Sequence, residues 1–250
     1  MRRLLVTIRY DGSQYHGWQV QKNAISVQTV VQDALQQVLQ SRPDIHGCSR
    51  TDAGVHAREY CFHFDTDHII EPDHLILAMN RNLPDDIAVS DCRQVSGDFH
   101  ARYSCVAKQY VYQIYNGRFR DPFHDRGWYF YPYQMDVERM NEAAQHFLGR
   151  HDFIGFCSVG GKMHDTVRTV SEARVERDGD EVRFCVTADG FLYNMVRIMT
   201  GTLLSVAQGK IQPDEMPGLI ASCSRARAGV TAPANGLWLN RVFYENLLLK

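Results

Sequence analysis

Apolar and polar residues alternate along the first hundred residues in a way that predicts strands and helices in turn. From Ser26, a residue type that caps helices, apolar residues recur at steps of three and four as far as Leu39, which indicates an amphipathic helix. A second helical pattern runs through Leu75 and Met79 and ends near Pro84. Strands are predicted at residues 4–9, 58–64 and 87–95. This order is that of a split βαβ unit with its helices on one face of a sheet.

The second half repeats such elements. Asp136 is predicted to cap a helix from Val137 to Leu148, and Asp178-Gly179 marks a tight hairpin turn. Further helices are predicted at 191–207 and 214–222, and strands at 107–115, 127–131, 167–176, 181–187 and 237–244. We therefore expect an α+β fold of two similar split-βαβ, ferredoxin-like lobes, residues 1–100 and 101–250. We expect them to form one continuous, mostly antiparallel sheet with helices on one face.

The amino-acid composition excludes only a few classes of protein. Hydrophobic residues make up 44% and charged residues 22% of the 250 residues, as in ordinary globular proteins. A net charge of -2 and a pI near 6.6 argue against coating nucleic acid by bulk charge, but they leave room for a local basic groove. Seven cysteines without a Cys-x-x-Cys pair favour reduced thiols in a cytoplasm. Asn194 and Arg197 interrupt the most apolar stretch, so no membrane span is expected.

The segment from Gly47 to Ala57 is the strongest candidate for chemistry. Asp52 stands between Arg50 and Gly54, on a predicted turn that leads into a strand. A carboxylate placed there is held firmly and still reaches a substrate. The local pattern alone also fits an aspartate that only supports the turn, which is the commoner case.

A basic and aromatic stretch follows between Phe99 and Arg120. Its four basic residues, accompanied by no acid, are Arg102, Lys108, Arg118 and Arg120. Such a mixture binds phosphates and stacks bases, although an ordinary edge strand has the same composition. Tyr110 shares one strand face with Lys108 and Tyr112, where a tyrosine suits a flat substrate.

Arg197 lies inside an otherwise apolar helical pattern, so it must either extend its head to water or meet an anion. A carboxylate or a phosphate is the expected partner in the second case. The eleven histidines include His56 and His63, whose spacing does not suit a metal site. No phosphate-binding glycine loop is present in the sequence.

Five blocks in order resemble the bacterial tRNA pseudouridine synthase A family. They are Tyr10-Asp11-Gly12 with Gly17-Trp18-Gln19, Arg50 to Ala57, Phe99 to Arg102 with Tyr110 to Tyr112, Met195 to Arg197, and Ala228 to Pro233 with Gly236-Leu237. They cover nearly the whole chain, and the block from Arg50 to Ala57 is the most specific. Ser49 departs from the family, which often has glycine there.

The resemblance implies an enzyme that converts uridine to pseudouridine at positions 38, 39 and 40 of the tRNA anticodon stem-loop. It implies that Asp52 is the nucleophile, that Tyr110 lies against the uracil and that Arg197 is the ion-pair partner of Asp52. It also implies a homodimer without metal or organic cofactor. From position, Arg50 is expected to occupy or brace the space that the flipped base leaves, and RNA contacts are expected at Arg58, Arg102, Lys108 and Arg118. The alternatives are a non-catalytic RNA-binding or RNA-chaperone protein and a metal-dependent hydrolase.

Overall fold

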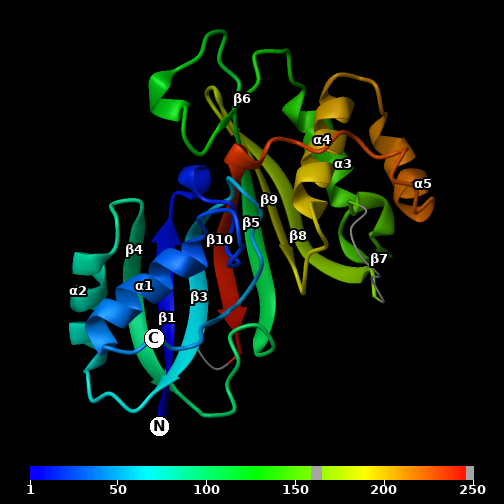
Figure 1. Ribbon diagram of the computed structural model, residues 1–250. Helices are drawn as coiled ribbons and strands as arrows, with labels where there is room; N and C mark the ends of the chain where they lie inside the picture. The colour runs from blue at the N-terminus through cyan, green and yellow to red at the C-terminus, as the bar shows by residue number, and fades with distance from the viewer. Residues whose placement is uncertain (159–164, 246–250) are drawn as a thin grey trace. The chain divides into compact units, whose positions relative to one another are not determined.

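The computed structural model describes residues 1–158 and 165–245, and it divides the chain into two compact units. The first contains residues 1–106 together with the last strand from Leu239 onward, and the second runs from Ala107 to Trp238. The division falls within two strands, β5 (Cys105–Tyr115) and β10 (Leu237–Tyr244). Figure 1 shows the elements of both units.

The first unit has the connectivity of a split βαβ motif. Its elements are β1 (Arg2–Tyr10), α1 (Val27–Leu39), β2 (His46–Gly47), β3 (His56–Thr66), α2 (Pro72–Asn82) and β4 (Ile87–Val95). β1 lies between β4 and β3 and is antiparallel to both. The short β2 is antiparallel to β3 on the other side, and β10 is also a neighbour of β3. The helix α1 therefore joins two strands, β1 and β2, that β3 separates.

The helix α1 spans the residues predicted from the sequence, and α2 ends at Asn82, near its predicted end. The Ser26 hydroxyl accepts the Thr29 backbone N–H at 3.2 Å and caps α1. The helix α2 starts with Pro72 in its first turn and buries Leu75 and Met79, which are one turn apart. In Figure 1, α1 crosses in front of β1.

The second unit repeats the motif in which a helix joins two strands separated by a third. Its elements are β5, β6 (Tyr129–Phe130), α3 (Val137–Gln145), β7 (Gly149–Asp152), β8 (Val167–Asp178), β9 (Glu181–Ala188), α4 (Met195–Ala207) and α5 (Met216–Ala221). β9 lies between β5 and β8 and is antiparallel to both, while β7 is antiparallel to β8. The small β6 runs parallel to β5. Thus α3 joins two strands, β5 and β8, on either side of β9.

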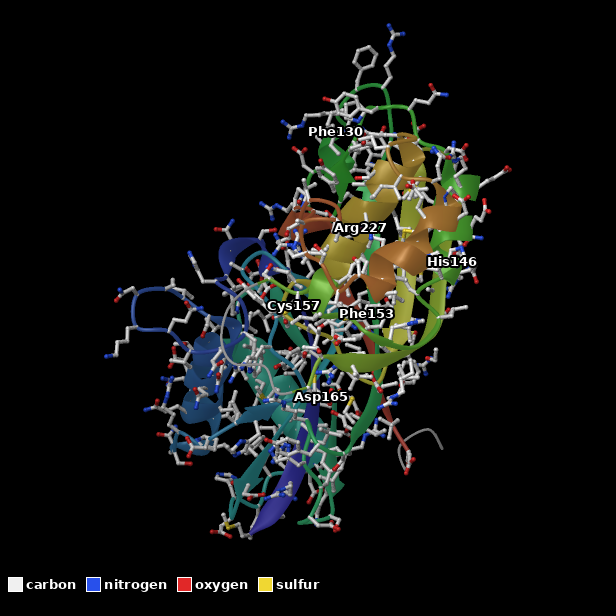
Figure 2. All side chains as sticks on the ribbon, turned by 90° about the vertical axis from the view of Figure 1, so that its right-hand side faces the viewer. Phe130, His146, Phe153, Cys157, Asp165 and Arg227 are labelled. Carbon is white, nitrogen blue, oxygen red and sulfur yellow. The ribbon has the colours of Figure 1, made fainter. Side chains whose placement is uncertain are left out.

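Aromatic rings fill the interior of the second unit. Phe147, Phe153, Phe156 and Phe184 are all buried. Phe156 packs edge-on against Phe147 at 5.3 Å between ring centroids and against Phe153 at 5.9 Å. Phe153 is labelled among the side chains of Figure 2. Phe147, two residues after the end of α3, therefore connects that helix to this core.

The predicted α+β class is confirmed, since the described residues 1–158 and 165–245 form five α-helices and a mostly antiparallel sheet. The hairpin turn at Gly179 is confirmed by its φ of 57°. Three boundaries were wrong. The strand predicted at 127–131 has only two residues, the helix predicted to Leu148 ends at Gln145, and α4 begins at Met195 rather than at 191. The last difference arises because Asn194 takes a left-handed φ of 61° in a turn closed by the Met195 N–H and the Leu192 carbonyl at 3.1 Å, and the helix starts only after it.

None of the helices within residues 1–158 and 165–245 is both long and apolar enough to cross a bilayer. In the same residues, no group of three or more His, Cys, Asp or Glu side chains is arranged to hold a metal ion.

Candidate active site

Asp52 lies on a turn between β2 and β3 in the first unit. The Val55 backbone N–H donates to the Asp52 carbonyl at 3.2 Å, and Gly54 has a φ of 77°, which closes the turn. Thr51 beside it is buried, whereas the Asp52 side chain is half-buried. The turn thus presents the carboxylate at the boundary between core and solvent.

The loop after β1 holds this turn from one side. The Tyr10 hydroxyl lies 2.8 Å from the Thr51 hydroxyl, and the Trp18 N–H donates to the Thr51 carbonyl at 3.1 Å. Further on, the Gly54 N–H donates to the Tyr15 carbonyl at 3.2 Å. Because the loop is hydrogen-bonded to the turn on both sides of Asp52, the backbone that carries the carboxylate is held in place.

Two glycines of that loop permit the close approach. A Cβ on Gly12 would lie 1.9 Å from the Val55 carbonyl oxygen, and a Cβ on Gly17 would lie 2.2 Å from the Thr51 carbonyl oxygen. Gly17 also has a φ of 80°, a conformation that residues with a Cβ rarely adopt. Both positions therefore require glycine for a reason that involves the Asp52 turn directly.

Gly17→Ala is expected to lower the free energy of unfolding by at least about 2 kcal/mol, through left-handed strain and the clash with Thr51. The matched control is Gly97→Ala, because a Cβ there meets no heavy atom within 4 Å. The control is expected to stay within about 0.5 kcal/mol of the parent. Urea denaturation measures both, and equal stability of the two variants would contradict the proposed grip on the turn.

Aromatic side chains support the strand end of the turn. Trp18 stacks on Tyr60 with 4.1 Å between ring centroids, and the Tyr60 hydroxyl donates to the Ser49 carbonyl at 2.5 Å. Ser49 is outside the left-handed region of φ, so its backbone does not require the glycine that the resembling family often has there. The departure at Ser49 is therefore compatible with the shape of the turn.

Two histidines considered for metal binding have other surroundings. His56 is buried, and its Nδ1 lies 3.1 Å from both the Gly12 nitrogen and the Asp11 carboxylate, so it joins the loop to β3. His63 is also buried, and its Nδ1 accepts the Ala101 N–H at 3.1 Å. Burial lowers the pKa of His63 to about 4. Both rings therefore have structural roles in the first unit.

Three of the predicted basic residues of the first unit face solvent. Arg50 stands on the turn, Arg58 on β3 and Arg102 on the loop before β5, and all three are exposed. Arg58 donates to the Asn240 side chain at 3.3 Å, and the Arg102 guanidinium lies 5.8 Å from the centroid of the Tyr103 ring. Each of these cations is therefore at the surface, where an RNA phosphate could contact it.

The strand β5 of the second unit carries Tyr110. Its side chain is buried and meets Phe191 edge-on at 5.0 Å between centroids. Lys108, two residues earlier, is half-buried. Tyr112 is completely buried, its hydroxyl donates to the Pro233 carbonyl at 2.7 Å, and burial raises its pKa. Tyr112 is therefore a structural residue, which leaves Tyr110 as the candidate on this strand.

Arg197 lies in the first turn of α4 and has two neutral acceptors within the second unit. Its Nε donates to the Ala232 carbonyl at 2.7 Å, and its Nη1 donates to the Asn194 side chain at 2.6 Å. The sequence did not predict either of these neutral acceptors, and they do not test the anionic partner that was expected. These two hydrogen bonds fix the direction of the guanidinium.

The segment from Ala228 to Pro233 is clamped onto α4 and places the Ala232 carbonyl. A Cβ on Gly201 would lie 1.8 Å from the Val230 carbonyl oxygen, so the segment touches the helix backbone. The Gly229 N–H donates to the Thr202 hydroxyl at 2.9 Å, and the Ala232 N–H donates to the Arg197 carbonyl at 3.1 Å. The block that follows α5 in the sequence is therefore a support for Arg197.

Asn194 has two roles, the left-handed backbone conformation before α4 and the side-chain amide that accepts from Arg197. Asn194→Gly keeps the left-handed conformation at no steric cost, whereas Asn194→Ala is expected to be less stable than the glycine variant by about 1 kcal/mol. Both variants lose the amide oxygen that accepts from Arg197. Chemical denaturation of the pair measures the difference, and an alanine variant at least as stable as the glycine variant would contradict this account.

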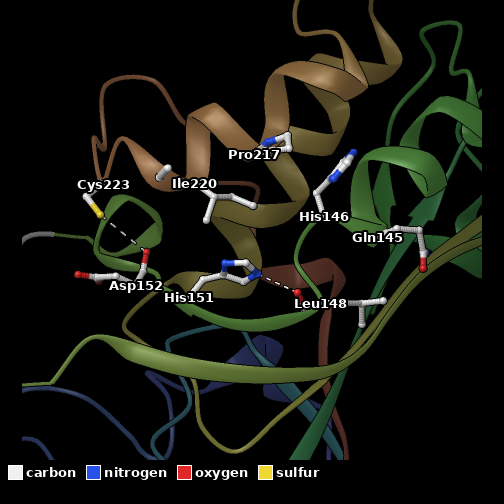
Figure 3. A pocket seen from close by; sticks show the side chains of 9 residues that line it. Gln145, His146, Leu148, His151, Asp152, Pro217, Ile220 and Cys223 are labelled. Atoms are coloured by element: carbon white, nitrogen blue, oxygen red, sulfur yellow. Dashed lines mark hydrogen bonds between the residues drawn. The ribbon is translucent and has the colours of Figure 1, made fainter.

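A separate hollow in the second unit opens beside α3, β7 and α5 and has a volume of about 490 Å³ (Figure 3). It is lined by Gln145, His146, Leu148, His151, Asp152, Pro217, Ile220, Ala221 and Cys223. The His151 ring binds the Leu148 carbonyl at 2.7 Å. None of the site residues predicted from the sequence belongs to this lining.

Comparison with known proteins identifies the family. The model of a family described as tRNA pseudouridine synthase matches residues 6–104 and 143–245. A protein of Acetivibrio thermocellus named tRNA pseudouridine synthase A is 46% identical over 244 residues, 98% of this chain and 100% of that protein. The protein of the same name from Ruminiclostridium cellulolyticum is 45% identical over 247 residues, 98% of this chain and 100% of that protein. The one from Staphylococcus saprophyticus is 44% identical over 241 residues, 96% of this chain and 90% of that protein.

The chain therefore belongs to the tRNA pseudouridine synthase family, which confirms the resemblance seen in the sequence. Asp52 and Arg197 lie within the matched ranges, and Tyr110 lies between them.

Proposed function

We propose that this protein isomerises uridine to pseudouridine at positions 38, 39 and 40 of the tRNA anticodon stem-loop. The observation that carries the proposal is the family match over both units, together with a rigidly held turn that presents Asp52. The relatives named tRNA pseudouridine synthase A support the choice of tRNA as substrate.

Asp52 acts as the nucleophile in this proposal. Breaking the glycosidic bond and rejoining the uracil through carbon needs an intermediate in which sugar or base is held, and a carboxylate supplies one by attack. The grip of residues 10–19 on the turn supports this role, because a fixed carboxylate loses little entropy on reaching the reactive geometry. Arg197 is proposed as the cation that keeps the carboxylate ionised.

Tyr110 and Arg50 are proposed to handle the base. Tyr110 lies against the uracil in this scheme, and its own packing on Phe191 supports a fixed ring orientation. A uridine in a stem must leave its stack before the acid reaches it. Arg50 is exposed two residues from Asp52, which suits a residue that braces the vacated space.

The RNA backbone is proposed to meet Arg58, Arg102, Lys108 and Arg118. The exposure of Arg58, Arg102 and Arg118 supports this, because surface guanidinium groups displace the counterions of phosphates. We further propose a cytoplasmic homodimer that needs neither metal nor organic cofactor. The seven cysteines are thiols rather than disulfides, which supports a reducing compartment.

The test is chemical mapping of pseudouridine in anticodon-arm RNA incubated with the purified protein. Conversion at any of the three positions is expected with the parent chain. Tight binding without conversion would instead support the non-catalytic RNA-binding alternative. Repeating the assay on prefolded RNA with a chelator addresses the hydrolase alternative, which a reproducible metal requirement would revive.

A further inference from the structure

The loop between β5 and β6, residues 116–128, carries apolar rings in solvent. Phe119 is 71% exposed and Phe123 is 91% exposed. The Arg118 guanidinium lies 5.1 Å from the centroid of the Phe119 ring. Figure 1 shows the chain around β6 extending beyond the strand ends. The loop falls outside the two ranges matched by the family model. Two exposed phenyl groups close together in sequence need an explanation.

Hydrogen bonds hold both ends of the 116–128 loop to other elements of the second unit. The Gly127 carbonyl accepts from the Gln113 side chain and from the Trp238 indole, each at 2.8 Å. A Cβ on Gly127 would lie 2.4 Å from the Trp238 ring. At the other end, the Asn116 N–H donates to the Asp180 carbonyl at 2.7 Å. Both ends are therefore fixed by contacts from other elements.

His124 fastens the middle of the loop. Its Nε2 lies 3.0 Å from a Glu181 carboxylate oxygen and its Nδ1 lies 2.7 Å from an Asp121 carboxylate oxygen. These hydrogen bonds, that to Glu181 first, raise the pKa of His124. The ring also stacks on Tyr115 at 4.3 Å. The exposure of Phe123, next to this anchored residue, thus belongs to an ordered conformation and is not the fraying of a loose loop.

The charges of the loop tip leave a cationic surplus beside the rings. Asp121 pairs with His124, and Asp125 pairs with Arg120 at 2.5 Å. Arg118 and Arg126 form no ion pair within the described part of the chain. Exposed aromatic faces next to guanidinium groups are the combination that binds unstacked bases and their phosphates.

We propose that the 116–128 loop is a second RNA-binding arm, which stacks an unpaired base of the tRNA on Phe119 or Phe123 while Arg118 and Arg126 meet the adjoining phosphates. This proposal rests on the proposed function. The loop starts after Tyr115, five residues beyond Tyr110 on the same strand, which corresponds to about 17 Å. The base it holds is therefore a different one from the uridine at Tyr110.

The test compares RNA affinity in exposed-residue variants. At least one of the variants Phe119→Ser and Phe123→Ser is expected to raise the Kd for an unmodified tRNA transcript at least about 5-fold, the lower bound for loss of one stacked base. Phe123→Trp keeps an aromatic face and is expected to stay within about 2-fold. The matched control is Leu77→Ser on α2, where an apolar side chain 65% exposed is removed and no change in Kd is expected.

The outcomes that contradict RNA binding by the 116–128 loop differ from those that contradict the proposed function. An unchanged Kd in both serine variants overturns the proposed RNA contact of the loop, even if pseudouridine still forms. If the serine variants lose self-association in sedimentation velocity while their RNA affinity is unchanged, the loop contacts a second copy of the chain and not RNA. Absence of pseudouridine from the parent reaction is failure of the proposed function, and it is read from the mapping assay and not from Kd.

Discussion

Asp52→Asn is expected to keep the fold and the RNA affinity while lowering turnover at least about 1000-fold, because an amide is a poor nucleophile of nearly the same shape. The turn should survive the change, since its hydrogen bonds with Tyr10, Tyr15 and Trp18 involve Thr51 and Gly54 rather than the carboxylate. Single-turnover formation of pseudouridine at saturating RNA is the measurement.

The control for this prediction is the Kd of the same variant. An unchanged Kd together with lost turnover assigns Asp52 to the chemical step. Residual activity within about tenfold of the parent would remove Asp52 from the nucleophile's role, because loss of a covalent nucleophile costs far more. A variant that binds RNA weakly or melts early would show instead that Asp52 supports the turn, the interpretation that local sequence also allows.

Tyr110→Phe is expected to lower the single-turnover rate by at least about 100-fold, the lower range for removal of a general acid or base. The phenylalanine keeps the ring and its edge-on contact with Phe191, so the change isolates the hydroxyl. If Tyr110 only holds the uracil, the cost would be within about 1.5 kcal/mol, the upper range for an aromatic pair. Half-buried Lys108 on the same strand supports proton transfer, since a nearby cation favours ionised tyrosine.

Tyr110→Leu is the comparison that separates the two roles, because it removes the flat face as well as the hydroxyl. A phenylalanine variant within about fivefold of the parent, with the leucine variant far slower, would show that stacking is the role of Tyr110. Thermal melting of both variants is needed beside the rates, because Tyr110 is buried and the leucine leaves space against Phe191.

Local patterns were sufficient for most elements. The steps of three and four after Ser26 predicted α1, Asp136 predicted the start of α3, and Gly179 predicted the hairpin turn. These features depend on neighbours within one turn of chain, where spacing and capping chemistry act directly. The block around Asp52 was likewise recognisable, because its residues are consecutive.

The supports of the site were decided by tertiary structure. Gly17 approaches the Thr51 carbonyl across more than thirty residues of chain, and the Ala232 carbonyl that orients Arg197 comes from beyond α5. The start of α4 at Met195 depends on the left-handed Asn194, whose side chain then reaches Arg197. Such contacts join segments that the folding of intervening elements brings together, and no periodicity records them. The sequence by itself therefore determined the family, the candidate residues and the elements they occupy, while tertiary packing decided what holds those residues in place.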